Sequence, residues 1–322
     1  MQILFAGTPQ FSVLPLKKIT EKYPVCGVLT GPDKLGGRGK KNIVSPVKAA
    51  ALELGLKIYQ PDAINREFIE LVSSLKPDIL VVAAYSKIFK EDFLNLFKYN
   101  GINLHPSLLP KFRGPSPIQA AILGGDEKTG ITIQKLALKM DAGNILVQKE
   151  FSLKGDETTE GLMNYTSNIG AEMLVGVLDS IIAGNCREIE QAHDKATYCR
   201  LIKKEDGCII WENNAIHIGR MIRAYKPWPG TYTSFNDLKL SILKGGALSK
   251  DSEISIKLVN NSENSNKSPG YVLGMDKNYG ILVKTGNDIL YIEELQLQTK
   301  KAMNWRTFLN GNKHIIGAQL GG

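Results

Sequence analysis

Asparagine and histidine stand two positions apart in the segment Gly101-Ile-Asn-Leu-His105, just before a stretch with four prolines. In an extended strand, residues i and i+2 face the same side, so Asn103 and His105 project together. An asparagine amide donates to a developing oxyanion, and histidine moves a proton near neutral pH. The pair is therefore a candidate catalytic site. The residues alone leave open the alternative that both only satisfy hydrogen bonds of a turn.

An aspartate follows in Met140-Asp-Ala-Gly143, a turn between two expected strands. Such Asp-x-Gly turns are commonly plain hairpin bends. Asp141 gains a chemical role only if it reaches His105, because a carboxylate beside an imidazole orients the ring and favours its charged form. Its membership of the site is therefore conditional on the fold.

The segment Gly31–Lys41 has four glycines and one acid, Asp33. Its basic residues are Lys34, Arg38, Lys40 and Lys41. A glycine-rich basic loop adapts readily to a phosphate backbone, although a solvated surface loop has the same composition. The turn after the first strand, Gly7-Thr-Pro-Gln-Phe11, lacks the second and third glycines of G-x-G-x-x-G and disfavours a dinucleotide site.

Alternating apolar and amphipathic stretches in the first half predict a doubly wound, mostly parallel, Rossmann-like α/β sheet. We expect strands at residues 3–6, 25–29, 78–84, 101–105, 130–140 and 144–153, and helices at 11–23, 46–54, 64–75 and 158–183. Asn103 and His105 then end a strand at the edge where such sheets bind ligands. After a polar linker, closely spaced short strands predict a smaller OB-like barrel, with a helix at 216–225 and strands at 239–243, 254–259, 271–273, 281–283 and 289–295. An Asn/Ser-rich tract, 260–268, separates two of these strands, and its role stays open.

The expected domains are residues 1–184 for catalysis, 185–206 as a linker and 207–322 as the OB-like domain. The chain of 322 residues has 40 Lys and Arg against 32 Asp and Glu, a net charge of +8 that is compatible with a nucleic-acid partner. No apolar run is long enough to span a membrane. Four scattered cysteines and an N-terminus without a signal segment favour a cytoplasmic protein with reduced thiols and no metal site. We expect a monomer without a stable protein partner, because no long apolar stripe is evident.

These motifs together resemble the 10-formyltetrahydrofolate-dependent formyltransferases, and within them the branch that acts on methionyl-tRNA. The resemblance rests on motifs that occur in order along almost the whole chain. They are Phe5-Ala-Gly-Thr-Pro9, Gly37-Arg-Gly-Lys-Lys41, Ser45-Pro-Val-Lys48, Ala83-Ala-Tyr85, Asn103-x-His-Pro-Ser-Leu-Leu-Pro110, Arg113-Gly-x-x-Pro117, Asp141-Ala-Gly143, Pro227-Trp-Pro229 and Lys300-Lys-Ala-Met303. The resemblance implies transfer of a formyl group from 10-formyltetrahydrofolate to the α-amino group of methionine on initiator tRNA, which supplies formylmethionyl-tRNA for translation initiation.

The same resemblance assigns roles to individual residues. Asn103, His105 and Asp141 match the family's catalytic trio. The residues that match its folate site are Tyr85, Ile88, Ser107, Leu108, Leu109, Pro110 and Gly143. The residues that match its tRNA-binding loop are Lys34, Arg38, Lys40 and Lys41. The implied partners are a folate and methionyl initiator tRNA, without a metal.

Three other functions share parts of this pattern. A formyltransferase acting on a sugar-nucleotide or ribonucleotide amine would keep the trio but would not need the basic loop. A hydrolase would release formate from the same folate, with water in place of the amine. An inactive RNA-binding module would not need an intact trio.

Overall fold

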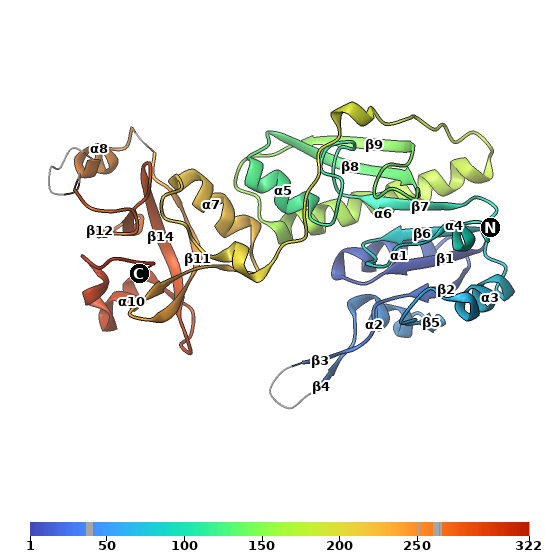
Figure 1. Cartoon of the computed structure of the whole chain (residues 1–322), viewed down its shortest axis with the longest axis horizontal. Coiled ribbons are helices and arrows are strands. Elements are labelled where there is room, and N and C mark those ends of the chain that lie inside the picture. Colours follow the sequence, from blue (N-terminus) through green and yellow to red (C-terminus); the bar gives the residue numbers. More distant parts are fainter. Residues whose placement is uncertain (37–40, 250, 260–263, 265, 322) are drawn as a thin grey trace. The chain divides into compact units, whose positions relative to one another are not determined.

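The computed structural model of the chain describes residues 1–36, 41–249, 251–259, 264 and 266–321 (Figure 1). Two compact units are present. The first comprises Met1–Ile118, Lys128–Leu153 and Gly161–Arg200, and the second comprises Gln119–Glu127, Lys154–Glu160 and Leu201–Gly322. Two short pieces of the N-terminal half thus belong to the second unit, which a division of the sequence into consecutive domains does not anticipate.

A seven-stranded sheet organises the first unit, with the order β5-β2-β1-β6-β7-β8-β9. Its strands are β1 (Ile3–Gly7), β2 (Val25–Leu29), β5 (Ile58–Tyr59), β6 (Ile79–Ala83), β7 (Gly101–His105), β8 (Lys128–Lys135) and β9 (Ile145–Ser152). The strands from β5 to β7 pair in parallel, and β8 and β9 are antiparallel. The expectation of a doubly wound, mostly parallel sheet is confirmed.

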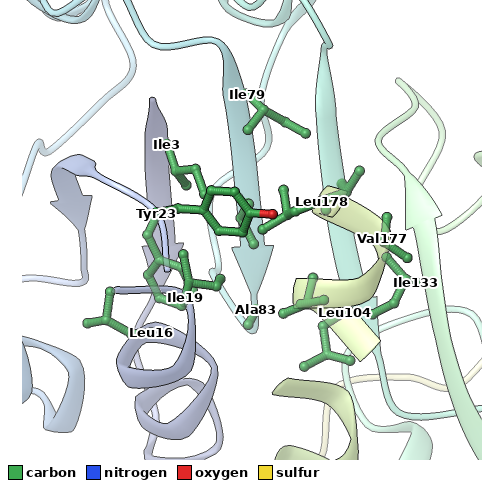
Figure 2. Packing of buried hydrophobic residues seen from close by; sticks show 14 of the residues in the cluster. Ile3, Leu16, Ile19, Tyr23, Ile79, Ala83, Leu104, Ile133, Val177 and Leu178 are labelled. Atoms are coloured by element: carbon green, nitrogen blue, oxygen red, sulfur yellow. The ribbon is translucent and has the colours of Figure 1, made fainter. Parts of the chain in front are cut away.

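Helices cover both faces of this sheet, which explains why its inner strands are apolar at every position. The helices are α1 (Val13–Thr20), α2 (Pro46–Glu53), α3 (Arg66–Ser74), α4 (Glu91–Leu94) and α6 (Thr159–Ile182), whereas α5 (Pro117–Gly124) belongs mostly to the second unit. In β1, Ile3 and Phe5 enter the core beneath α1 and α6, whereas Leu4 and Ala6 enter the core shared with α3 and α4. Figure 2 shows α1 and α6 contributing Leu16 and Leu178 to the first of these cores.

A short hairpin of β3 (Lys34–Gly36) and β4 (Lys41–Ile43) is inserted between β2 and α2. It extends away from the sheet of the first unit (Figure 1). Helix α2 starts directly after it, because the Ser45 side chain accepts from the Lys48 N–H at 3.0 Å and Pro46 fills the first helical position. The described ends of the glycine-rich basic segment therefore belong to a two-stranded ribbon.

Antiparallel strands form the sheet of the second unit, in the order β10-β11-β14-β13-β12 with β15 paired to β14. They are β10 (Thr231–Phe235), β11 (Leu238–Ala247), β12 (Val272–Asp276), β13 (Gly280–Lys284), β14 (Ile289–Leu297) and β15 (Met303–Asn304). Helices α7 (Ala215–Ala224), α8 (Glu253–Val259) and α10 (Trp305–Gly311) accompany them. A separate antiparallel domain is thus present, and among the described residues its sheet does not close into a barrel.

The strand expected at residues 254–259 is wrong, because α8 occupies this position. Ser252 starts the helix by accepting from the Ser255 N–H at 3.2 Å. Ile254 and Leu258 pack on the small core beside β13, whereas Ile256 is 49% exposed. A strand would have placed these three side chains on one face, so helical periodicity prevailed over the alternation of β-branched residues. Most of the following Asn/Ser-rich tract lies outside the described residues.

No helix in the described part of the chain is long and apolar enough to cross a membrane. The polar segment expected as a linker is not extended away from the first unit. Residues 189 and 198 form bridges with Ile145 and Arg113, and the 3-10 helix His193–Lys195 lies between them. A second 3-10 helix, Lys204–Gly207, follows in the second unit.

Candidate active site

Asn103, His105 and Asp141 converge at the end of β7, as the sequence predicts conditionally. The Asn103 amide donates to Asp141 Oδ1 at 3.3 Å, and His105 Nδ1 lies 3.6 Å from the same oxygen. The His105 and Asp141 side chains are only 5% and 13% exposed, while Asn103 is partly exposed. The condition for Asp141 to act with His105 is met in the geometry of the first unit.

The loop after β7 orients the imidazole from its other side. His105 Nε2 lies 2.9 Å from the Phe112 carbonyl oxygen, and because a carbonyl only accepts, Nε2 carries a hydrogen in this arrangement. Two residues further on, the Gly114 N–H donates to Asp141 Oδ2 at 2.8 Å. Phe112 adopts φ +59° and Gly114 φ +116°. One bent loop therefore holds both the histidine and the aspartate.

Gln134 is a further site residue, which the sequence analysis missed. In the antiparallel pair of β7 and β8, Gln134 lies opposite Asn103, and Thr132 lies opposite His105. The Gln134 amide donates to Asp141 Oδ1 at 2.9 Å, and the side chain is 1% exposed. Two polar residues at alternate positions of the apolar run Ile-Thr-Ile-Gln134 are the signal that was available in the sequence.

Arg113 and Gln191 form a second layer behind the trio, also missed from sequence. Both side chains are 3% exposed. Gln191 Oε1 accepts from Arg113 Nε at 3.1 Å and from Nη2 at 2.7 Å. Gln191 comes from the segment that the sequence analysis treats as a linker, so only the fold could place it beside Asp141.

Cys199 lies near the loop that follows β7, but its environment does not favour a nucleophile. Its thiol contacts the Phe112 and Arg113 carbonyls and accepts from the Ser116 N–H at 3.3 Å. Burial raises the pKa of the Cys199 thiol, and the hydrogen bond from Ser116 offsets this only in part. The thiol therefore stays protonated, and a nucleophilic cysteine is not the chemistry of this site.

The residues expected to bind folate lie in three environments. Ser107 is fully buried, its hydroxyl donates to the Lys111 carbonyl at 2.6 Å, and its own carbonyl accepts from Thr132 Oγ1 at 2.7 Å. Leu109 is also buried, its N–H donates to Thr132 Oγ1, and the Leu109–Pro110 peptide bond is cis. Leu108 packs against Gly130, where an added Cβ would lie 2.4 Å from a Leu108 methyl carbon. These contacts fix the conformation of the loop next to the trio. The residues therefore support the edge of the expected folate site from its buried side.

Tyr85 and Ile88 lie in the segment after β6. Tyr85 stacks on Phe89 with ring centroids 5.6 Å apart, and Ile88 is 72% exposed. Burial raises the pKa of Tyr85 to about 12, and its buried hydroxyl has no hydrogen-bond partner among the described residues. The expected folate contacts of both residues stay predictions.

The basic loop is described only at its base. Lys34 and Lys41 lie in β3 and β4, their side chains are not described, and Arg38 and Lys40 lie outside the described residues. At the base, Lys48 Nζ contacts Asp33 Oδ2 at 2.6 Å and Gln60 Oε1 at 2.8 Å. Gln60 Nε2 in turn donates to Asp33 Oδ1 at 2.9 Å and to the Gly31 carbonyl at 2.6 Å. Hydrogen bonds from Lys48 and Gln60 lower the pKa of Asp33, so the Asp33 carboxylate stays charged. We call Asp33, Lys48 and Gln60 the clamp.

Gly143 closes the turn after Asp141 because no side chain fits there. A Cβ at this position would lie 1.9 Å from the Lys135 carbonyl oxygen. We expect Gly143→Ala to lower the free energy of unfolding by about 1–3 kcal/mol, since the backbone must move. Gly176→Ala is the matched control, because a Cβ at this exposed position of α6 meets nothing within 4 Å. The free energy of unfolding of the control, measured with denaturant, should rise by about 0.5–1 kcal/mol. Equal stability of the two variants would contradict the close approach at Gly143.

Comparison with known proteins agrees with the residues at the site. Residues 1–178 match the family described as formyl transferase, and residues 201–313 match the formyl transferase C-terminal domain. A methionyl-tRNA formyltransferase of Treponema denticola is 42% identical, with 98% of each chain covered. The chain belongs to the formyl transferase family. A second methionyl-tRNA formyltransferase, from Borrelia duttonii, is 38% identical over 98% of this chain and 99% of its own length.

A solved structure shares the fold at low sequence identity. An N-formyltransferase of Helicobacter canadensis, solved with folinic acid and dTDP-3-aminofucose, superposes with a TM-score of 0.64 at 19% identity, covering 90% of this chain and 98% of its own. At this identity the likeness shows the fold alone. The family resemblance stated from the sequence motifs is confirmed by the matches over the whole chain.

Proposed function

We propose that the chain transfers the formyl group of 10-formyltetrahydrofolate to the α-amino group of methionyl initiator tRNA. The observation that carries this proposal is the convergence of Asn103, His105 and Asp141 around one carboxylate oxygen, in a chain that aligns with methionyl-tRNA formyltransferases over almost its full length. Because those relatives are similar to this chain in both domains, we favour an aminoacyl-tRNA acceptor over a sugar nucleotide.

The chemistry begins when the neutral amine of the methionyl ester attacks the formyl carbon. Negative charge then develops on the formyl oxygen, and the partly exposed Asn103 amide donates to it. His105 contributes positive charge or a donated proton to the same formyl oxygen. For this, its Nε2–H leaves the Phe112 carbonyl and donates to the substrate. Asp141 holds both groups and passes the amine proton, directly or through water, toward N10 of the folate. The C–N10 bond then breaks, the formyl group remains on the methionine nitrogen, and tetrahydrofolate leaves with a hydrogen on N10.

The folate donor is a substrate, and we assign it to the edge formed by Tyr85, Ile88, residues 107–110 and Gly143. The Tyr85 hydroxyl, without a hydrogen-bond partner in the described ranges, and the exposed Ile88 support this assignment, since one offers a hydrogen bond and the other an apolar wall. A formamide on a stabilised amine is already an activated acyl group, so the chain's own donors suffice for this step.

We assign the tRNA to two parts of the chain. Lys34, Arg38, Lys40 and Lys41 would contact phosphates at the acceptor end, and the C-terminal domain, in an OB-like arrangement, would contact the remainder. Residues 207–322 carry 14 Lys and Arg against 9 Asp and Glu, which suits this partner. We further propose that catalysis resides in 1–184, that 185–206 connects the two parts, and that the protein acts in the cytoplasm as a monomer.

The decisive experiment combines binding with turnover. The purified protein is given aminoacylated initiator tRNA with 10-formyltetrahydrofolate, and the ester product is hydrolysed and analysed. The proposal predicts formylmethionine. Formate released without a formylated ester would indicate the hydrolase, tRNA binding without turnover would indicate the inactive RNA-binding module, and formylation of only a sugar-nucleotide or ribonucleotide amine would indicate the other formyltransferases.

The clamp of Asp33, Lys48 and Gln60 yields a separate prediction about the basic loop. Lys48→Met removes the cation that joins the base of the hairpin to α2. We expect KM for tRNA to rise about 3- to 10-fold, with kcat and KM for the folate unchanged within about twofold, since ion pairs of this kind contribute on the order of 1 kcal/mol. Lys17→Met, which removes an exposed pair with Glu53, is the control. A change in kcat alone would contradict the role of the clamp.

A further inference from the structure

Arg113 is a buried cation whose side-chain partners, within the part of the chain that the structure describes, are all neutral. Its guanidinium donates to Gln191 Oε1 and to the Tyr198 hydroxyl at 3.3 Å, and Nη2 lies 2.9 Å from His193 Nδ1. Because arginine only donates, His193 Nδ1 is the acceptor there. A buried charge is tolerated only where its field is used or balanced. Gln191 Oε1 receives two of these hydrogen bonds, at 3.1 and 2.7 Å, so the guanidinium charge lies directly against Gln191.

The double contact with Arg113 fixes which way the Gln191 amide faces. With Oε1 on the guanidinium, Nε2 must point the other way. There it lies 2.9 Å from the Asp141 carbonyl, 2.6 Å from the Gly143 carbonyl and 3.2 Å from Gln134 Oε1. Two N–H hydrogens thus serve three acceptors. Gln191 therefore holds the backbone on both sides of Ala142, in a turn where Asp141 itself adopts φ +52°.

The orientation of Gln134 follows from that of Gln191. Its Oε1 accepts from Gln191, so its Nε2 faces Asp141 Oδ1, at 2.9 Å. This is the oxygen that also accepts from Asn103 and faces His105. The hydrogen bonds from Arg113 through the two glutamines consequently all run in one direction and end on the proposed catalytic carboxylate.

We propose that Arg113, Gln191 and Gln134 form a positioning relay, a directed chain of buried hydrogen bonds that sets the location of Asp141 and supplies one of its donors. The inference rests on the proposed function of Asp141. The relay acts on the aspartate from two directions, through the backbone of its turn and through its Oδ1. Polarised amides in a buried chain strengthen each other, so the guanidinium charge reaches the carboxylate without direct contact.

The segment that carries Gln191 is itself fixed on both sides. Ile189 pairs with Ile145 through two backbone hydrogen bonds, at 2.8 and 2.9 Å. The Arg113 N–H donates to the Thr197 carbonyl, and the Cys199 N–H donates to the Arg113 carbonyl, both at 2.8 Å. The segment from Ile189 to Cys199 therefore places Gln191, and the second unit begins shortly after it, at Leu201. A relay built on such a fixed backbone can hold Asp141 to within a fraction of an ångström.

Gln191→Glu separates positioning from structural support. The glutamate keeps an acceptor for Arg113, as an ion pair, but replaces the donor that faces three carbonyl oxygens with a second acceptor. We expect the thermal midpoint to be retained while kcat falls on the order of 10- to 100-fold, with KM for both substrates within about twofold. A crystal structure of this variant should show Asp141 Oδ1 displaced from Asn103 Nδ2. An unchanged kcat, or an undisplaced Asp141, overturns the relay.

Gln134→Met tests the last link with a side chain of similar volume. We expect a similar loss of kcat, and the double variant with Gln191→Glu should be no more than about threefold slower than the slower single variant, because residues of one chain act as a unit. If the kcat losses of the two single variants multiply in the double variant, the relay is overturned. Tyr198→Phe is the control. It removes a hydrogen bond of Arg113 that is not part of the relay, so kcat should stay within about twofold.

The two proposals fail in different ways. If the unaltered protein does not formylate methionyl-tRNA, the proposed function fails, and the position of Asp141 in the Gln191→Glu crystal structure still decides the relay. If the unaltered protein is active and both glutamine variants match it, only the relay fails.

Discussion

Asp141→Ala is expected to lower kcat for formyl transfer by about 10³-fold or more, with KM for tRNA and folate nearly unchanged. The carboxylate accepts hydrogen bonds from Asn103, Gln134 and the Gly114 N–H, and it lies next to His105. Its removal takes away the proton carrier and leaves the other groups without a common anchor. Loss of such a proton-transfer group costs about 10²- to 10⁴-fold, and the lost anchoring of Asn103 adds to this. Single-turnover kinetics with formylmethionine as the product measures the effect.

Two further variants show whether the effect comes from chemistry. Glu53→Ala removes one negative charge from an exposed pair with Lys17 and should leave kcat unchanged. Asp141→Asn keeps the size of the side chain, but an amide cannot serve the Gly114 N–H and the two amide donors together without presenting a donor to a donor. It should therefore be almost as slow as alanine. Wild-type turnover by either Asp141 variant would exclude Asp141 from catalysis.

The first unit is largely predictable because its residues obey local rules. Strands β1 and β6 are buried on both faces and are apolar at every position, and runs of only five such residues favour a buried strand over a helix. The i, i+2 spacing of Asn103 and His105 then predicts a shared face at the end of β7. The two residues do lie on one face, opposite Thr132 and Gln134 of the antiparallel β8.

Other features depend on contacts between distant parts of the chain, which a pattern does not encode. Helix α8 arises because Ile254 and Leu258 have a small core to pack against, while a cap at Ser252 favours the helical start. Gln191 lies 50 residues beyond Asp141 in a polar segment that carries no periodicity. Its role follows only from the backbone bridge at Ile189 that places it over the turn. Sequence patterns therefore predict the proposed catalytic trio better than the residues that hold it.

Neutralising the basic loop is expected to impair use of tRNA while leaving the folate half of the reaction intact. The variant replaces Lys34, Arg38, Lys40 and Lys41 by glutamine. At roughly 0.7 kcal/mol for each lost phosphate contact, KM for methionyl-tRNA should rise on the order of 100-fold. The slope of log affinity against log salt should become shallower by up to about 3–4, since each released cation contributes nearly one. Folate affinity and kcat at saturating tRNA should change by less than about twofold.

A control with the same change in net charge distinguishes a local contact from a general field. The lysines Lys17, Lys18, Lys22 and Lys128 each pair with a carboxylate on the surface of the first unit. Replacing these four by glutamine removes as many positive charges, yet it removes no proposed phosphate contact. If both variants lose the same affinity and the same salt slope, net charge alone attracts the tRNA, and the loop has no specific role. If only the loop variant loses both, the ribbon of β3 and β4 presents its cations to the RNA backbone, and the clamp at its base gains its purpose from that contact.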